Sequence, residues 1–225
     1  MYKYIFFDLD GTITQSEFGI LNSVEYALKN MGIEETDRTK LRKFIGPPLV
    51  DSFKEYYGMS DEDAVKAVVL YRDYYGKGEM FNAPLFDGVL DTVKYLKNEG
   101  FTLYIVTSKP LDYARLIADH FGLMDIFTDV CGPELGIKTY TKIDIVREAM
   151  TLAGGKDPDP GLFIMVGDRC YDIESARENG IDSVGVLYGY GSKKELEDEG
   201  ATYIISRIEE LRGIVNGKTE RRVTS

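Results

Sequence analysis

The first apolar stretch of the sequence ends in two aspartates. Residues 4–7 read YIFF, and the letters DLDGT follow at residues 8–12. Burying a carboxylate among apolar side chains is costly unless a proton, a cation or hydrogen bonds compensate its charge. Since side chains two positions apart point to the same side of a strand, we expect the Asp8 and Asp10 side chains to point to the same side of this strand. Taken alone, the pattern is also typical of an ordinary turn at Gly11.

Three later segments carry polar residues that could join these aspartates. They are IVTSK (105–109), GIKTYTKIDIV (136–146) and MVGDRCYD (165–172). With Thr12, the candidate residues in them are Thr107, Ser108, Lys109, Lys138 or Lys142, Asp168 and Asp172. Clustered carboxylates repel one another unless a hard cation joins them, and oxygen ligands suit Mg²⁺. Together with a lysine and hydroxyls, Mg²⁺ would make a phosphate site in which an aspartate attacks phosphorus.

A parallel sheet would bring these segments together. After residue 84, runs rich in β-branched and aromatic residues alternate with amphipathic segments. The expected strands are residues 102–108, 126–132, 162–168, 183–187 and 202–206, and the expected helices lie near 87–99, 110–121, 142–153, 171–179 and 207–214. With the first strand, this alternation predicts an α/β fold with a doubly wound, mostly parallel, Rossmann-like sheet. Such sheets place their chemistry at the carboxyl ends of the strands, where the candidate residues lie.

Residues 15–82 interrupt this alternation. Their apolar residues recur at helical spacing, and Ser60 followed by an acidic turn is typical of a helix start. We expect roughly four helices and no strand here, which makes the segment a helical cap inserted into the sheet domain. The predicted organisation is a core of residues 1–14 and 83–216, a cap of residues 15–82 and a polar C-terminal tail of residues 217–225.

Composition excludes several classes of function. The chain has 225 residues, of which 44% are hydrophobic and 29% charged, as in ordinary globular proteins. A net charge of −11 argues against a nucleic-acid partner, which needs a basic face. No apolar run reaches the roughly 18 residues that a membrane span requires. Two isolated cysteines, Cys131 and Cys170, predict neither a disulfide framework nor a zinc site, so we expect a cytoplasmic protein.

The motifs resemble those of the haloacid dehalogenase superfamily. DLDGT, VTS, a following lysine and GDRCYD stand in that superfamily's usual order, and the resemblance covers nearly the whole chain. Within it, FIGPPL (44–49), VGDRCYDIESARENGI (166–181) and GVLYGYGS (185–192) are similar to the phosphoglycolate phosphatase group, above all to its 5′-nucleotidase-like branch. The resemblance implies a Mg²⁺-dependent phosphatase for a small phosphorylated metabolite, phosphoglycolate or a nucleoside monophosphate. A monomer or a homodimer is expected.

The resemblance also implies a role for each candidate residue. Asp8 is the nucleophile that forms an aspartyl-phosphate, and Asp10 is the general acid and base, whose backbone carbonyl helps hold Mg²⁺. Asp168 binds the metal directly, and Asp172 binds it through water or orients the site. Lys142 is preferred to Lys138 because TKIDIVREA (141–149) begins a helix as the family's lysine segment does. The phosphoryl and substrate contacts are assigned to Gly11, Thr12, Thr107, Ser108 and Lys109, and in the cap to Pro47 and Arg72.

Two other functions would use many of the same residues. A phosphomutase forms the same aspartyl-phosphate but returns the phosphoryl group to a sugar. A phosphate-receiving signalling domain also combines an aspartate, a hydroxyl, a lysine and Mg²⁺, yet Asp10 and a helical cap would be superfluous there. Dehalogenation is disfavoured, because the dehalogenases of this superfamily lack the second aspartate.

Overall fold

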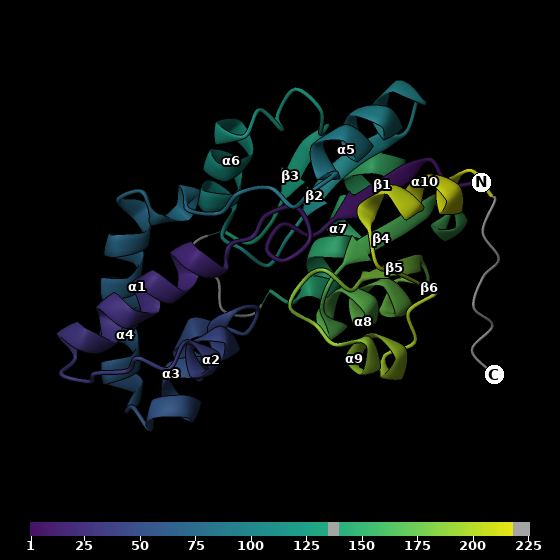
Figure 1. Cartoon of the computed structure of the whole chain (residues 1–225). Helices are drawn as coiled ribbons and strands as arrows, with labels where there is room; N and C mark the ends of the chain where they lie inside the picture. Colours follow the sequence, from purple (N-terminus) through teal and green to yellow (C-terminus); the bar gives the residue numbers. More distant parts are fainter. Residues whose placement is uncertain (135–139, 218–225) are drawn as a thin grey trace. The chain divides into compact units, whose positions relative to one another are not determined.

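The structure, a computed structural model that describes residues 1–134 and 140–217, contains a parallel sheet of six strands (Figure 1). The strands are β1 (Tyr4–Phe7), β2 (Thr102–Val106), β3 (Asp129–Cys131), β4 (Phe163–Gly167), β5 (Asp182–Val186) and β6 (Tyr203–Ile205). Their order is β3-β2-β1-β4-β5-β6, and all neighbours run parallel. The prediction of a doubly wound parallel sheet is therefore confirmed.

Contacts divide the chain into two compact units. The core unit consists of Met1–Thr14 and the chain from Leu85 onward, and the helical unit is Gln15–Pro84. The helical unit contains α1 (Glu17–Asn30), α2 (Arg38–Leu41), α3 (Leu49–Tyr57) and α4 (Asp61–Gly76). The core unit contains α5 (Val89–Asn98), α6 (Leu111–His120), α7 (Lys142–Gly154), α8 (Cys170–Glu178), α9 (Lys193–Asp198) and α10 (Leu211–Val215). The role of the helical unit as a substrate cap stays a prediction.

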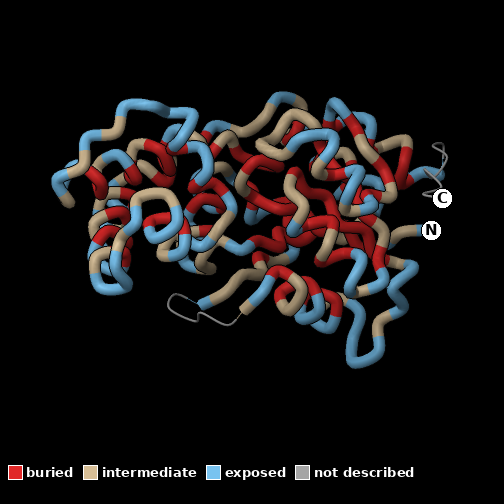
Figure 2. Tube along the Cα trace, turned by 90° about the horizontal axis from the view of Figure 1, so that it is seen from below, coloured by how far each residue is buried: buried red, intermediate tan, exposed pale blue. Residues whose placement is uncertain are grey.

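Apolar layers on both faces hold the sheet of the core unit. On one face, Tyr4 and Phe6 pack with Phe163 of β4 and with residues of α7 and α8 such as Ile145 and Ala176. The rings of Tyr4 and Phe163 are stacked, with centroids 4.6 Å apart. Helices α5 and α10 lie on the other side of the sheet from α8 (Figure 1). In Figure 2, the buried segments of this unit accordingly lie together in its interior.

The strand order reverses direction between β1 and β4. From β1 the chain runs outward to β2 and β3, then returns to β4 on the other side of β1 and continues to β5 and β6. Phe7 pairs with both Ile105 and Val166, so β1, β2 and β4 end at nearly the same level. The residues that follow these strands, among them Asp8 and Asp168, are thereby placed at the crevice where open α/β sheets bind ligands.

Two elements differ from the sequence-based expectation. Strand β3 begins at Asp129, because Ile126 and Phe127 belong to a turn in which both backbone amides donate to the carbonyl of Leu123. An apolar run of this length is compatible with a strand or with a buried turn. Helix α9 was not expected, since Leu196 is its one buried residue and no amphipathic pattern marks it. The 217–225 tail lies outside the described residues except for Gly217.

The two segments that join the units are paired with each other. The amide of Phe86 donates to the carbonyl of Ile13 at 3.0 Å, and Thr14 and Leu85 form an antiparallel bridge. The amide of Gln15 then donates to the carbonyl of Pro84 at 2.7 Å. The chain thus leaves and re-enters the core unit at adjacent positions. Among the described helices, none combines the length and the apolar character that crossing a membrane requires.

Candidate active site

Lys142 joins Asp8, which follows β1, to Asp172 in the first turn of α8. Its Nζ lies 2.5 Å from Asp8 Oδ1 and 3.0 Å from Asp172 Oδ1, and it donates to the carbonyl of Val106 at 2.7 Å. All three charged side chains are buried, with exposures of 6% for Lys142, 12% for Asp8 and 4% for Asp172. An ammonium group has three hydrogens to donate, and these three acceptors match them. Lys138, the alternative, lies outside the described residues.

The position of Lys142 is fixed by the start of α7. Thr141 accepts a hydrogen bond from the amide of Asp144 at 3.3 Å, and Asp144 accepts one from the amide of Thr141 at 3.1 Å. This reciprocal capping box makes Lys142 the first residue of the helix. A cation is disfavoured at a helix N-terminus by the helix dipole, so the two aspartates must account for the burial of Lys142 here.

The buried charges of this site shift one another's pKa values. Burial raises the pKa of Asp8 to about 7, against the opposing effect of Lys142 and with further raising by Asp172. For Lys142, burial opposes the charged form, but Asp172 and Asp8 outweigh it and raise the pKa. Burial also raises the pKa of Asp168 well above its ordinary value, and Asp172 and Asp8 add to the rise. The single ammonium of Lys142 thus faces three carboxylates, those of Asp8, Asp168 and Asp172, and does not balance their combined charge.

This set of oxygen atoms fits a divalent cation. Asp8, Asp168 and Asp172 each offer a carboxylate oxygen, and these oxygens lie within 4.8 Å of one another. The ammonium of Lys142 reaches Asp8 and Asp172, while the hydrogen bonds to Asp168 come from uncharged groups. A hard ion such as Mg²⁺, which takes oxygen ligands, would supply the missing charge.

Asp168 is oriented by neutral donors. It is fully buried, and its Oδ1 accepts from the hydroxyl of Thr12 at 3.2 Å while its Oδ2 accepts from the amide of Tyr190 at 2.7 Å. Gly11 lies against the same carboxylate with φ +90°, and a Cβ at this position would overlap Asp168 Oδ2. Glycine is therefore required at position 11, because of the positive φ and because a side chain would collide with Asp168. The neighbouring Thr12 contacts the same carboxylate through its hydroxyl.

Asp10 forms an ion pair with Lys109, which the sequence did not suggest. The Lys109 ammonium donates to both Asp10 oxygens, at 2.9 and 2.7 Å, and the Lys109 side chain is only 6% exposed. Two charge-assisted hydrogen bonds from one ammonium fix the orientation of the Asp10 carboxylate. In this structure Lys109 lies on Asp10, and its predicted contact with substrate stays a prediction.

The remaining predicted residues are found in different surroundings. Thr107 is buried at the end of β2, where its hydroxyl accepts from the amide of Lys109 at 3.2 Å, whereas Ser108 is exposed. Pro47 and Arg72 are half-buried residues of the helical unit, Arg72 within α4. Their predicted contacts with substrate stay predictions.

Two contributors were missed by sequence reasoning. The loop after β5 supplies the Tyr190 amide, and a backbone donor leaves no mark in the sequence except the glycines on either side of it. Glu195 of α9 accepts from the Arg169 side chain and from the Cys170 amide, both at 2.9 Å, and so holds the start of α8. The pattern of Ser192 followed three residues later by Glu195 is a readable helix-start signal.

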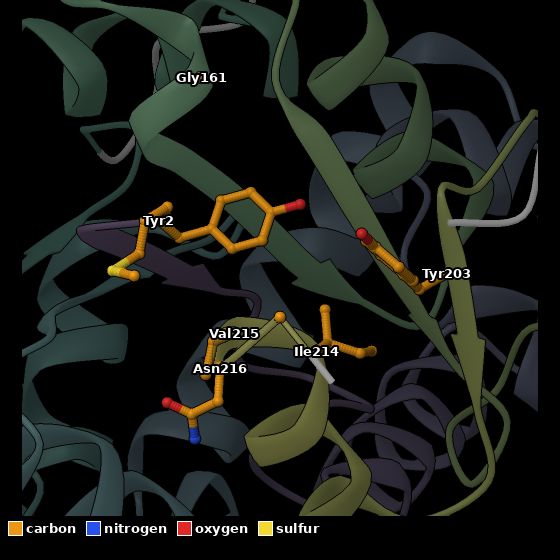
Figure 3. A pocket seen from close by; sticks show the side chains of 8 residues that line it. Tyr2, Gly161, Tyr203, Ile214, Val215 and Asn216 are labelled. Atoms are coloured by element: carbon orange, nitrogen blue, oxygen red, sulfur yellow. The ribbon is translucent and has the colours of Figure 1, made fainter. Parts of the chain in front are cut away.

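A separate pocket lies at the amino ends of the strands (Figure 3). It has a volume of about 240 Å³ and includes Tyr2, just before β1, and Tyr203, the first residue of β6. The Tyr2 hydroxyl donates to Asp182 at 2.5 Å. The pocket contains none of the predicted site residues and is distinct from the carboxylate cluster.

Known proteins resemble this chain over almost its full length. A 5′-nucleotidase from Pseudomonas aeruginosa is 37% identical over 95% of this chain and 96% of its own. The tyrosine-protein kinase PtkA of Mycobacterium tuberculosis is 34% identical over 93% of this chain and 71% of its own. Phosphoglycolate phosphatase 1 of P. aeruginosa is 26% identical over 93% of this chain and 78% of its own.

Solved structures agree with this relationship. The crystal structure of a predicted phosphatase from Clostridium acetobutylicum superimposes with a TM-score of 0.88 at 41% identity, covering 96% of this chain and 99% of that one. Residues 5–186 match the family described as haloacid dehalogenase-like hydrolase. This confirms the expected superfamily and the expected class of enzyme. The chain belongs to the haloacid dehalogenase-like hydrolases.

Proposed function

We propose that this hydrolase is a Mg²⁺-dependent phosphomonoesterase that works through an aspartyl-phosphate on Asp8. The observation that carries the proposal is the contact of Asp8 with Lys142 inside a cluster of three buried carboxylates. Lys142 favours the ionised, nucleophilic form of Asp8 and fixes the direction of its carboxylate. A receiver domain would need neither Asp10 nor the Lys109 that orients it.

In the first step, Asp8 attacks phosphorus. Lys142 holds Oδ1, so we assign the attack to Oδ2: the new bond joins Oδ2 to phosphorus, and the bond from phosphorus to the leaving oxygen breaks. Asp10, carrying a proton, gives it to that oxygen, and the product alcohol departs. The Thr107 hydroxyl and nearby amides hold the phosphoryl oxygens. Bound Mg²⁺, held by Asp8, Asp168 and the backbone carbonyl of Asp10, would neutralise charge on those oxygens.

In the second step, water attacks the phosphorus of the aspartyl-phosphate. Asp10, now ionised, takes a proton from the water, and the Oδ2–phosphorus bond breaks to release inorganic phosphate and free Asp8. The two hydrogen bonds from Lys109 hold the Asp10 carboxylate in a fixed orientation for this proton transfer. We propose that in the first step Lys109 turns from Asp10 to the incoming phosphoryl group and so makes the substrate contact expected of it.

Release of inorganic phosphate from a panel of phosphomonoesters tests this proposal. The names of the relatives make nucleoside monophosphates and phosphoglycolate the first substrates to compare. Phosphate release that depends on added Mg²⁺ is the expected result. An isomerised sugar phosphate without phosphate release would indicate a phosphomutase, and transfer of label from nucleotide to protein tyrosine would indicate the activity named for PtkA.

Removal of divalent cations is expected to stop phosphate release. The carboxylates would then lack the cation that screens them from the anionic substrate. Treatment with a chelator followed by gel filtration should lower the rate to the background, and added Mg²⁺ should restore it. Full activity in excess chelator would contradict the metal assignment.

Mg²⁺ affinity is expected to fall as the pH is lowered. The pKa of Asp8 is raised to about 7 without metal, so below pH 7 the cation must displace a proton. For one such proton, the dissociation constant for Mg²⁺ should rise about tenfold between pH 8 and pH 6. Isothermal titration at several pH values measures this. A dissociation constant that stays flat or tightens on acidification would contradict the prediction.

A further inference from the structure

We propose that the loop of residues 188–191, here called the clamp loop, positions Asp168 for its cation. The inference rests on the metal site of the proposed function and assigns a role to a segment outside it. The clamp loop follows β5 and is separated in sequence from both DLDGT and Asp168, yet it contacts both. Its residues act through Asp168 and do not touch the substrate in the proposed mechanism.

The first element of the clamp is the pair of hydrogen bonds on Asp168. The Tyr190 amide donates to Oδ2 at 2.7 Å, and the Thr12 hydroxyl donates to Oδ1 at 3.2 Å. Both donors are neutral, so they fix the plane of the carboxylate without cancelling its charge. Asp8 and Asp172, by contrast, share the ammonium of Lys142. Asp168 is therefore oriented by neutral donors rather than by an ammonium, as suits a ligand whose charge partner is a cation.

The second element is close packing by glycines. A Cβ on Gly191 would overlap the backbone oxygen of Asp168, and a Cβ on Gly189 would overlap both the Asp168 side chain and the backbone oxygen of Gly11. The clamp loop thus lies directly against the backbone of Asp168 and of DLDGT. Any larger residue at either glycine must push the loop away and move the Tyr190 amide with it.

The third element is Tyr188, which ties the clamp loop to the other side of the site. Its hydroxyl donates to the carbonyl of Thr12 at 3.0 Å, and its ring packs on Phe86 with centroids 4.8 Å apart. Thr12, Asp168, Tyr190 and Tyr188 therefore form a closed ring of contacts. A displacement of the loop would disturb both donors of Asp168 together.

Substitution of Gly191 by Ala should weaken Mg²⁺ binding without removing any ligand. Loss of groups that orient a metal ligand lowers affinity by about 10- to 100-fold, and we expect a change of that size. The measurement is isothermal titration of Mg²⁺ into metal-free protein with no substrate present. Tyr188→Phe, which keeps the ring and removes the bond to Thr12, should weaken binding severalfold in the same titration.

Gly185→Ala is the matched control. A Cβ on Gly185 would lie 2.8 Å from Leu196 Cδ1, so this variant is also crowded, but against α9 rather than Asp168. It should lower the melting temperature while leaving the dissociation constant for Mg²⁺ unchanged. If the clamp loop had a purely structural role, Gly191→Ala and Tyr188→Phe would behave like Gly185→Ala: the melting temperature would fall and the dissociation constant for Mg²⁺ would not change.

Mg²⁺ binding by the wild type tests the proposed metal site, and Mg²⁺ binding by the variants tests the clamp loop. Wild-type protein that binds no Mg²⁺ would contradict the proposed function and, with it, the clamp. Wild-type binding together with folded variants of unchanged affinity would overturn the clamp alone. Should Gly191→Ala fail to fold, Tyr188→Phe decides, because it introduces no new atom into the site.

Discussion

Replacement of Asp8 by Asn is expected to lower phosphate release at least about 10³-fold while the chain stays folded. The amide is a poor nucleophile, and the aspartyl-phosphate cannot form on it. The variant keeps Lys142 paired with Asp172 at 3.0 Å, so no buried ammonium is left without a partner. Phosphate release measured under saturating Mg²⁺ gives the rate, and circular dichroism checks the fold.

The same variant should be more stable than the wild type when metal is absent. In the folded protein the pKa of Asp8 is raised to about 7, above its value in the unfolded chain. Its protonated form therefore stabilises the fold at low pH, and this contribution is lost as the pH rises through 7. Thermal melts in chelator should show little difference near pH 4 and a growing advantage for Asp8→Asn toward pH 8.

Asp119→Asn makes the same chemical change at an exposed position of α6 and should leave both the rate and the pH dependence of stability as in the wild type. If Asp8→Asn retains more than a few per cent of the wild-type rate, another residue is the nucleophile.

Replacement of Lys142 by Met has the second large expected effect, on both activity and stability. Without the ammonium, Asp8 and Asp172 face each other across the space it occupied, and breaking a buried ion pair from one side costs about 3–5 kcal/mol. We expect a large fall in the melting temperature of the metal-free protein at pH 8. The fall should be smaller at pH 5, where Asp8 can take up a proton. The rate should drop about 10²-fold or more, because ionised Asp8 is no longer favoured.

Lys138→Met is the matched control for this variant. Both lysines lie in the same segment, GIKTYTKIDIV, and both were candidates for the phosphate lysine. We expect Lys138→Met to keep the melting temperature and nearly the full rate. A loss of activity in Lys138→Met, with Lys142→Met active, would reverse the assignment.

The sequence predicted the sheet and much of the carboxylate cluster for physical reasons. Strands buried on both faces read as apolar runs, and polar residues that end such runs must meet at one edge of a parallel sheet. This rule brings Asp8 and Asp168 together, and Asp172 lies close to them in the first turn of α8, four residues after Asp168. Lys142 was preferred because TKIDIVREA begins a helix as the family's lysine segment does, and in the structure Thr141 and Asp144 form the capping box that starts this helix.

Other features of the site could not be predicted from the sequence. The pairing of Lys109 with Asp10 depends on how two loops after neighbouring strands approach each other, which residue type alone does not determine. The Tyr190 amide acts through the backbone, so the identity of its side chain gives no signal. Helix α9 is too short and too polar to show a periodic pattern, so its only readable mark is the Ser192–Glu195 start signal, and the contact of Glu195 with the start of α8 has no mark in the sequence.

The paired segments at Thr14 and Leu85 have an evolutionary consequence. The chain leaves the core unit at Thr14 and returns at Leu85, and these two residues are bridged. The whole helical unit therefore connects two adjacent positions, as the turn of a tight hairpin does. Insertions are best tolerated where their ends are already neighbours. The core unit and the helical unit can then diversify as separate modules, because the helical unit can be lengthened, exchanged or replaced without moving the strands that it joins.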